Sequence, residues 1–136
     1  YRDEDFLTQF RDIVFTENIN DLYEKSDVIS LHIPHTSKTD KLINRDVLFR
    51  KMKKNPIVIN TSRGKLVDTD SVIEAIEKDQ IRGYLTDVLA EEPIHDEEKL
   101  IGVKNIIITP HVGSRTYQSV QRQGTSSIIN LINELI

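Results

Sequence analysis

The 136-residue sequence contains no cysteine and no tryptophan, one methionine and only five glycines. The lack of cysteine excludes disulfide bonds and thiolate chemistry. No apolar run approaches the roughly 20 residues that a membrane-spanning helix needs, so we expect no membrane partner and a cytoplasmic location. The net charge is -4, with both signs spread along the chain. The sequence has no basic block of the kind that indicates a nucleic-acid partner.

Apolar runs alternate with helical patterns along a chain that is long enough for one domain with a real core. The apolar runs predict strands over residues 28–33, 57–60, 83–89 and 106–109, and a short further strand over 13–15. The nearly continuous apolar character of the middle runs is typical of strands that are covered on both faces. Crossovers of roughly 20 residues predict βαβ units, and hence an α/β fold with a parallel sheet and flanking helices.

Helices are predicted between the strands and at the end of the chain. The candidate first residues are Asn18 or Asn20 for one helix, Asn44 for the next, and Asp68 or Thr69 for the third. A long C-terminal helix is predicted from Ser114 onward. Its broad apolar face indicates that it packs against something.

Polar residues follow each of the four main predicted strands. In open α/β sheets, ligands bind beyond the carboxyl ends of the strands. The residues that stand there are His35, Arg63, Asp87, Glu92 and His111. Four separate strand ends therefore deliver an arginine, carboxylates and histidines to one edge of the sheet.

Each of these residues also has a structural interpretation. Arg63 could cap a helix end or pair with Asp68, whereas its functional role would be a planar fork that grips a substrate carboxylate. His111 could be a loop histidine whose ring nitrogens only make structural hydrogen bonds, or it could be a proton carrier. Glu92 could be a simple loop acid, and Asp87 could cap a turn. Structural or surface roles are favoured for the other histidines, which are His32, His35 and His95, although His35 follows Pro34 and could line the cleft.

The candidate residues lie in four motifs: "SDVISLHIPHTSKT", "INTSRGKLVDTDSVIEAI", "TDVLAEEP" and "ITPHVGSRT". In this order, the motifs resemble the later motifs of the D-isomer-specific 2-hydroxyacid dehydrogenases, which are two-domain NAD(P) oxidoreductases. The resemblance runs from about Asp27 to Ser114. It implies the later part of a Rossmann-like cofactor domain, NAD or NADP as cofactor, a small 2-keto or 2-hydroxy acid as substrate, and a homodimer.

The resemblance also implies a role for individual residues. Arg63 would bind the substrate carboxylate, and His111 would be the acid/base group. Glu92, which directly precedes Pro93, would pair with His111 and favour the imidazolium. The residues expected at the cofactor are Ile33, Pro34, Thr39, Thr61, Ser62, Arg63, Asp87, His111, Gly113 and Ser114, with Asp87 at the nicotinamide carboxamide. No metal ligand is implied.

The sequence departs from the family at the G-x-G-x-x-G turn, which its five glycines do not form. We therefore expect residues 1–112 to be an incomplete cofactor domain, and residues 113–136 to be a helix that packs on or links to a missing substrate domain. Because the chain starts at Tyr1, we expect that other residues precede it. The four later strands should be adjacent and parallel, and residues 13–15 should not pair with residues 28–33. The strand at 28–33 would then be an exposed edge.

Two other functions on the same scaffold are considered. Some transcriptional corepressors resemble these dehydrogenases and use NAD binding to drive assembly. Formate dehydrogenases are relatives that would carry glutamine where Glu92 stands. The sequence favours the 2-hydroxyacid dehydrogenase, and "HVGSRT" looks more like the glycerate and hydroxypyruvate group than the D-lactate group. Without the glycine turn, the isolated chain is expected to be inactive.

Overall fold

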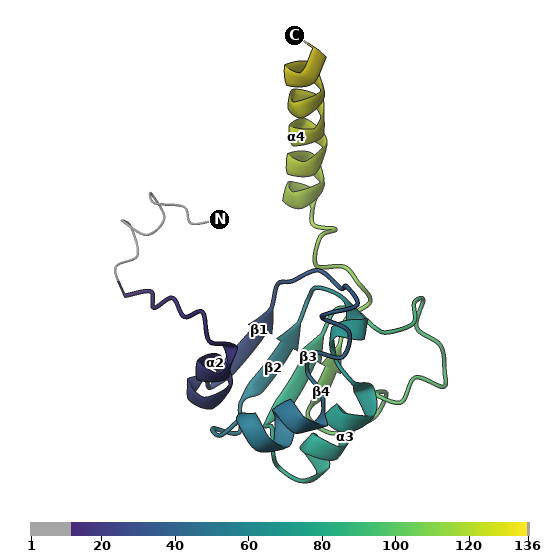
Figure 1. Ribbon diagram of the computed structural model, residues 1–136. Coiled ribbons are helices and arrows are strands. Elements are labelled where there is room, and N and C mark those ends of the chain that lie inside the picture. Colours follow the sequence, from purple (N-terminus) through teal and green to yellow (C-terminus); the bar gives the residue numbers. More distant parts are fainter. Residues whose placement is uncertain (1–11, 136) are drawn as a thin grey trace.

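A four-stranded parallel sheet forms the centre of the molecule, in a computed structural model that describes residues 12–135 (Figure 1). Its strands are β1 (Val28–Leu31), β2 (Ile57–Asn60), β3 (Gly83–Thr86) and β4 (Ile106–Ile108), and their spatial order is the order in the chain. All neighbouring strands are parallel. The predicted order and direction of the four strands are confirmed. Tyr1 lies outside the described residues.

Three of the strands end earlier than the sequence predicts. β1 ends at Leu31, opposite Asn60, which is the last residue of β2. β3 ends at Thr86, because the Thr86 hydroxyl donates a hydrogen bond to the Val88 carbonyl at 2.6 Å and turns the chain out of the sheet. β4 ends at Ile108, opposite Thr86. Each strand therefore stops where its neighbour stops, since an extended chain needs a partner for its backbone hydrogen bonds.

The predicted short strand at residues 13–15 is wrong. This segment has irregular backbone, and Val14 is 86% exposed. Among residues 12–135, β1 has a neighbouring strand on one side only, and residues 13–15 do not pair with it, as we expected. An apolar run with no strand beside it cannot form a ladder, and β1 is an edge of the described sheet.

The helices begin where the capping residues predict. Helix α2 (Ile19–Lys25) begins after Asn18, whose side chain accepts a hydrogen bond from the Asn20 amide at 3.1 Å. Helix α3 (Thr69–Glu77) begins after Asp68. The second predicted helix contains η1 (Val47–Lys51), a π-helical turn in which the Met52 amide donates to the Val47 carbonyl at 3.0 Å. A short 3-10 helix, η2 (Gly64–Leu66), follows β2.

The described helices cover one face of the sheet. Burial alternates along β1 and β2, and the buried face packs on Ile43, Leu48, Leu66 and Val72. On the other face, Val28 is 51% exposed. The described helices lie on one side only, and the coverage predicted for the middle strands is partial: β3 has buried residues on both faces, whereas Ile57 and Ile59 of β2 are half-buried.

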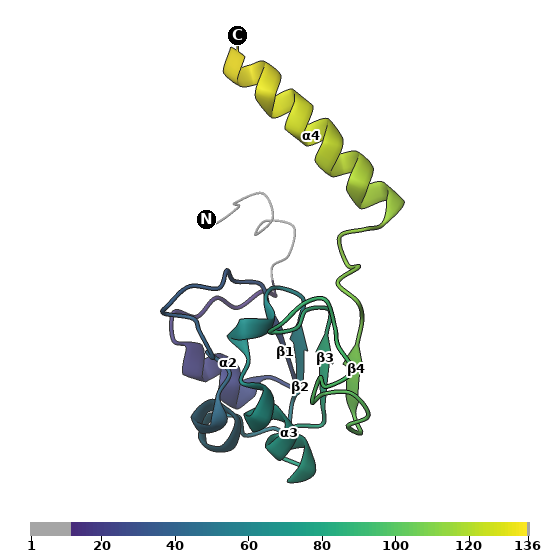
Figure 2. The same ribbon diagram turned by 90° about the vertical axis from the view of Figure 1, so that its right-hand side faces the viewer.

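Helix α4 (Tyr117–Leu135) stands away from the sheet, beyond the carboxyl ends of the strands (Figures 1 and 2). It begins at Tyr117 and not at Ser114, because residues 112–115 form a turn in which the Arg115 amide donates to the Val112 carbonyl at 2.9 Å. No side chain of α4 is buried within residues 12–135, so the predicted packing of its apolar face against another part of the protein stays a prediction. Over the same residues, no helix combines the length and the apolar character needed to cross a membrane.

Candidate active site

Arg63 lies in a turn that a buried asparagine holds at the end of β2. Asn60 is fully buried; its Oδ1 accepts from the Ser62 amide at 3.1 Å, and its Nδ2 donates to the Arg63 carbonyl at 2.9 Å. The guanidinium of Arg63 is exposed and donates to the Ser62 carbonyl at 2.6 Å. It has no carboxylate partner in the described part of the chain, because Asp68 pairs with Lys41 at 2.8 Å. Arg63 is therefore available to bind an anion with its planar fork.

Gly64 allows the Arg63 turn to pack directly on the loop that follows β3. A Cβ atom at Gly64 would lie 2.0 Å from the Leu89 carbonyl carbon and 2.3 Å from the Ala90 nitrogen. Glycine is needed here for the close approach of two backbones. This contact brings the Arg63 turn beside the loop that carries Glu92.

Glu92 and His111 form a hydrogen-bonded pair. Nδ1 of His111 lies 2.7 Å from Oε2 of Glu92, and the Leu89 amide donates to Oε1 at 2.9 Å. Because an ionised carboxylate only accepts hydrogen bonds, Nδ1 carries the proton and Nε2 is left free to act on a substrate. The hydrogen bonds from His111 and from the Leu89 amide hold the pKa of Glu92 below its usual value. Glu91 instead lies 3.5 Å from His95.

One cavity of about 400 Å³ is lined by Arg63, Glu92 and His111 together. The three residues follow β2, β3 and β4 respectively. The structure therefore places the three predicted catalytic residues on one wall at the carboxyl edge of the sheet. A bound carboxylate, a proton carrier and its carboxylate partner can meet in this space.

A second cavity, of about 570 Å³, adjoins the first and shares Arg63 and His35 with it. Its other lining residues are Ile33, Pro34, Thr61 and Ser62, all predicted at the cofactor. The Ser62 hydroxyl donates to the Leu31 carbonyl at 2.8 Å and ties the ends of β1 and β2 together beneath this cavity. The mixed apolar and polar lining fits the nicotinamide end of a dinucleotide, whereas the sequence lacks the glycine turn that fits its phosphates.

The remaining predicted cofactor residues do not line this cavity. Thr39 instead shapes its own loop, since its hydroxyl donates to the Pro34 carbonyl at 2.9 Å and accepts from the Thr36 amide at 2.8 Å. Asp87 is buried at the end of β3 and contacts the turn after His111. Gly113 and Ser114 belong to that turn.

Asn60 and Thr109 were not predicted at the site, whereas His35, for which a structural or surface role was favoured, was predicted as a residue that could also line the cleft. Asn60 and Thr109 each provide a polar side chain at the end of an apolar strand, which is a signal that the sequence contains. His35 lies 2.7 Å from Asp40 and also lines both cavities beside Arg63. Its side chain therefore belongs to the wall of the candidate site.

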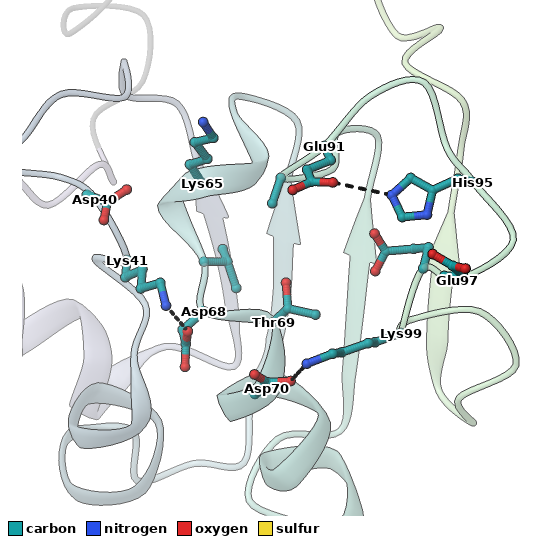
Figure 3. Close-up of a pocket in the computed structure, with 13 residues that line it drawn as sticks. Asp40, Lys41, Lys65, Asp68, Thr69, Asp70, Glu91, His95, Glu97 and Lys99 are labelled. Carbon is teal, nitrogen blue, oxygen red and sulfur yellow. Dashed lines mark hydrogen bonds and ion pairs between the residues drawn. The ribbon is translucent and has the colours of Figure 1, made fainter.

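A separate charged cavity, of about 520 Å³, lies beside the first (Figure 3). Its charges largely satisfy one another through three pairs: Lys41–Asp68 at 2.8 Å, Lys99–Asp70 at 2.7 Å and His95–Glu91 at 3.5 Å. Lys65 points away from the Lys41 pair (Figure 3). Because most of its acids and bases are already paired, we assign no ligand to this cavity.

Comparison with known proteins identifies the family of the chain. Residues 2–113 match the family described as D-isomer specific 2-hydroxyacid dehydrogenase, NAD binding domain. The chain is 43% identical over 113 residues to a glyoxylate reductase of Thermococcus litoralis, covering 82% of this chain and 33% of the relative. A glyoxylate reductase of Thermofilum pendens is 38% identical, with 94% of this chain and 37% of the relative covered.

The fold is similar to that of a solved D-lactate dehydrogenase from Sporolactobacillus sp. The TM-score is 0.76 with 33% identity, over 94% of this chain and 42% of that chain. The chain therefore spans 33% to 42% of the length of these related proteins.

Proposed function

Because the chain belongs to the D-isomer specific 2-hydroxyacid dehydrogenase family, within its NAD binding domain, we propose an activity for the full-length protein that contains this chain. That protein reduces a small 2-keto acid to a D-2-hydroxy acid with NADH or NADPH. The observation that supports this most is the pairing of His111 with Glu92 in a cavity that Arg63 also lines.

Arg63 binds the substrate carboxylate with two parallel hydrogen bonds from its guanidinium, which fixes the position of the neighbouring carbonyl group. The nicotinamide cofactor, when bound, supplies the hydride for the carbonyl carbon. His111 donates a proton from Nε2 to the carbonyl oxygen, and it removes that proton in the oxidative direction. Glu92 accepts the Nδ1 hydrogen bond, orients the imidazole and stabilises its charged form.

The cofactor lies along the carboxyl edge of the sheet in this proposal. Ile33 and Pro34 contact it from the end of β1, and Thr61 and Ser62 contact it from the end of β2, because these residues line one cavity. Asp87 keeps one of its four lone-pair positions for a carboxamide N–H after its three hydrogen bonds within the protein. The other proposed contacts are Thr39, Arg63, His111, Gly113 and Ser114. The protein acts as a homodimer.

A steady-state assay of the natural full-length protein tests the proposal. Oxidation of NADH and of NADPH is followed with glyoxylate, hydroxypyruvate and pyruvate. We expect turnover with at least one of these acids, and chiral chromatography should identify the D product where the product is chiral. Binding of NADH without turnover of any 2-keto acid would contradict the proposal and would favour a role in NAD-regulated assembly.

A further inference from the structure

Asp87 is a buried carboxylate at the end of β3, and it is only 7% exposed. A buried charge is unfavourable by several kcal/mol unless its surroundings compensate for it. Among residues 12–135, no lysine or arginine forms an ion pair with Asp87. The compensation must come from hydrogen bonds.

Those hydrogen bonds come from the turn that follows β4. The Thr109 hydroxyl donates to Oδ1 of Asp87, and the Val112 amide donates to the same oxygen at 3.0 Å. The Gly113 amide donates to Oδ2 at 2.8 Å. Burial alone would raise the pKa of Asp87, but these hydrogen bonds outweigh burial and hold the pKa below its usual value.

The same turn carries His111 in an unusual backbone conformation. Its φ is +53°, in the left-handed region, and its amide donates to the Thr109 carbonyl at 3.0 Å. Such a conformation is unfavourable for a residue with a side chain and persists only where neighbouring contacts impose it. The contacts to Asp87 lie on both sides of His111 in the chain, at Thr109 and at Val112 and Gly113.

Gly113 completes the contact with Asp87. A Cβ atom at this position would lie 2.9 Å from Oδ2 of Asp87. This distance is too short for a side chain to fit without movement of the carboxylate. The backbone of the turn at Gly113 thus lies directly against the carboxylate of Asp87.

We propose that Asp87 and Thr109 are positioning residues, which hold the turn of residues 109–113 so that the imidazole of His111 meets Glu92 and presents Nε2 to the substrate. Neither residue needs to contact the reacting atoms for this role. The expected effect on catalysis rests on the proposed function. The expected stabilisation of the turn by Asp87 and Thr109 does not.

The test uses the natural full-length protein with Thr109→Val, which keeps the shape of the side chain and removes the hydroxyl donor. Thr109→Ser keeps the donor and is the conservative variant. Asp87→Asn is a second variant: its amide nitrogen cannot accept, so at least one donor of the turn loses its partner. Thr125→Val, on the exposed helix α4, is the matched control.

The first measurement is hydrogen exchange at the amides of Val112 and Gly113, which needs no catalytic activity. We expect roughly tenfold faster exchange or more in Thr109→Val and Asp87→Asn, since a lost hydrogen bond opens the turn more often. Thr109→Ser and Thr125→Val should exchange as the natural protein does. Unchanged exchange in both Thr109→Val and Asp87→Asn would overturn the proposal.

The second measurement separates kcat from KM for the 2-keto acid. A misplaced proton donor should lower kcat by roughly 10- to 100-fold, while KM changes little, because Arg63 still binds the carboxylate. Thr109→Ser should restore most of the kcat. Faster exchange with an unchanged kcat would show that Asp87 and Thr109 are only structural and would overturn the positioning role. Absence of turnover in the natural protein itself would instead refute the proposed function and, with it, the expected effect on kcat. Hydrogen exchange at Val112 and Gly113 would then decide whether Asp87 and Thr109 stabilise the turn.

Discussion

Nδ1 of His111 lies 2.7 Å from Oε2 of Glu92, although 19 positions separate the two residues in the chain. The pair forms because β3 and β4 are parallel neighbours, with Thr86 opposite Ile108, so the loops that follow them leave the sheet side by side. Arg63 arrives from β2 at the same edge. The arrangement of three strands thus assembles a proton carrier, its partner and an anion-binding group.

Replacement of His111 should remove most of the turnover of the natural full-length protein. We expect His111→Ala to lower kcat by about 10²- to 10⁴-fold, because a positioned general acid contributes about that much. Steady-state kinetics with the preferred 2-keto acid measure this effect. His95→Ala is the control, since His95 pairs with Glu91 outside the site and its loss should leave kcat unchanged. A His111→Ala protein with full kcat would refute the acid/base role.

Replacement of Arg63 should chiefly weaken binding of the substrate. Arg63→Lys keeps the positive charge but loses the planar fork, so we expect kcat/KM to fall by about 10- to 100-fold, mainly through KM. Arg122→Lys, on the exposed helix α4, is the matched control and should have no effect. If KM stays at its natural value in Arg63→Lys, the carboxylate binds elsewhere.

Two glycines should respond in opposite directions to a single added methyl group. Gly64→Ala places Cβ 2.0 Å from the Leu89 carbonyl carbon, and we expect a loss of about 1–3 kcal/mol or more in the free energy of unfolding. Gly124→Ala meets nothing within 4 Å inside helix α4. It should stabilise that helix by about 0.5–1 kcal/mol. Urea denaturation measures both, and equal effects of the two substitutions would contradict the close approach at Gly64.

Glu74 should contribute stability that depends on pH. Arg45 donates to it twice, at 2.9 Å each, and Lys78 donates once at 2.7 Å. These contacts lower the pKa of Glu74 from about 4.5 to about 2. Because the folded pKa is the lower one, the stabilisation is complete above about pH 4.5 and is lost as the pH falls toward 2.

The variant Glu74→Gln tests this dependence. We expect its free energy of unfolding to lie below that of the natural protein at pH 7, with a difference that shrinks progressively below about pH 4.5. Glu77→Gln, on the exposed side of the same helix, is the control. A difference between Glu74→Gln and the natural protein that is as large at pH 2.5 as at pH 7 would show that the ion pairs are not its cause.

The 136-residue chain alone should bind NAD weakly or not at all. It contains the cavity lined by Pro34 and Thr61, but none of its five glycines forms the G-x-G-x-x-G turn that binds the phosphates of a dinucleotide. Calorimetric titration of this chain with NAD measures the affinity. Saturation at micromolar cofactor would show that the described residues are sufficient for binding.

From the amino-acid sequence alone, the class of fold and the sheet edge that carries the candidate site could be predicted. Apolar runs ended by polar residues, with crossovers of helical pattern, specify a parallel sheet, and ligands of such sheets bind at the carboxyl ends. Asn18 and Asp68 marked the starts of their helices, because both residue types are favoured at the N-cap, and the Asn18 side chain accepts from the Asn20 amide there. The resemblance of the motifs to the family predicted Arg63, Glu92 and His111 together as the catalytic residues.

The contacts that those residues make are visible only in the tertiary structure. The short strand predicted at 13–15 is wrong because a strand requires a neighbour, whereas the packing predicted for α4 stays a prediction because no described residue buries that helix. Asp87, expected at the cofactor, also accepts hydrogen bonds from the turn that carries His111, a contact that no sequence pattern predicted. Hydrogen bonds between loops of different strands depend on the register of the sheet, and local sequence patterns do not encode distances across it.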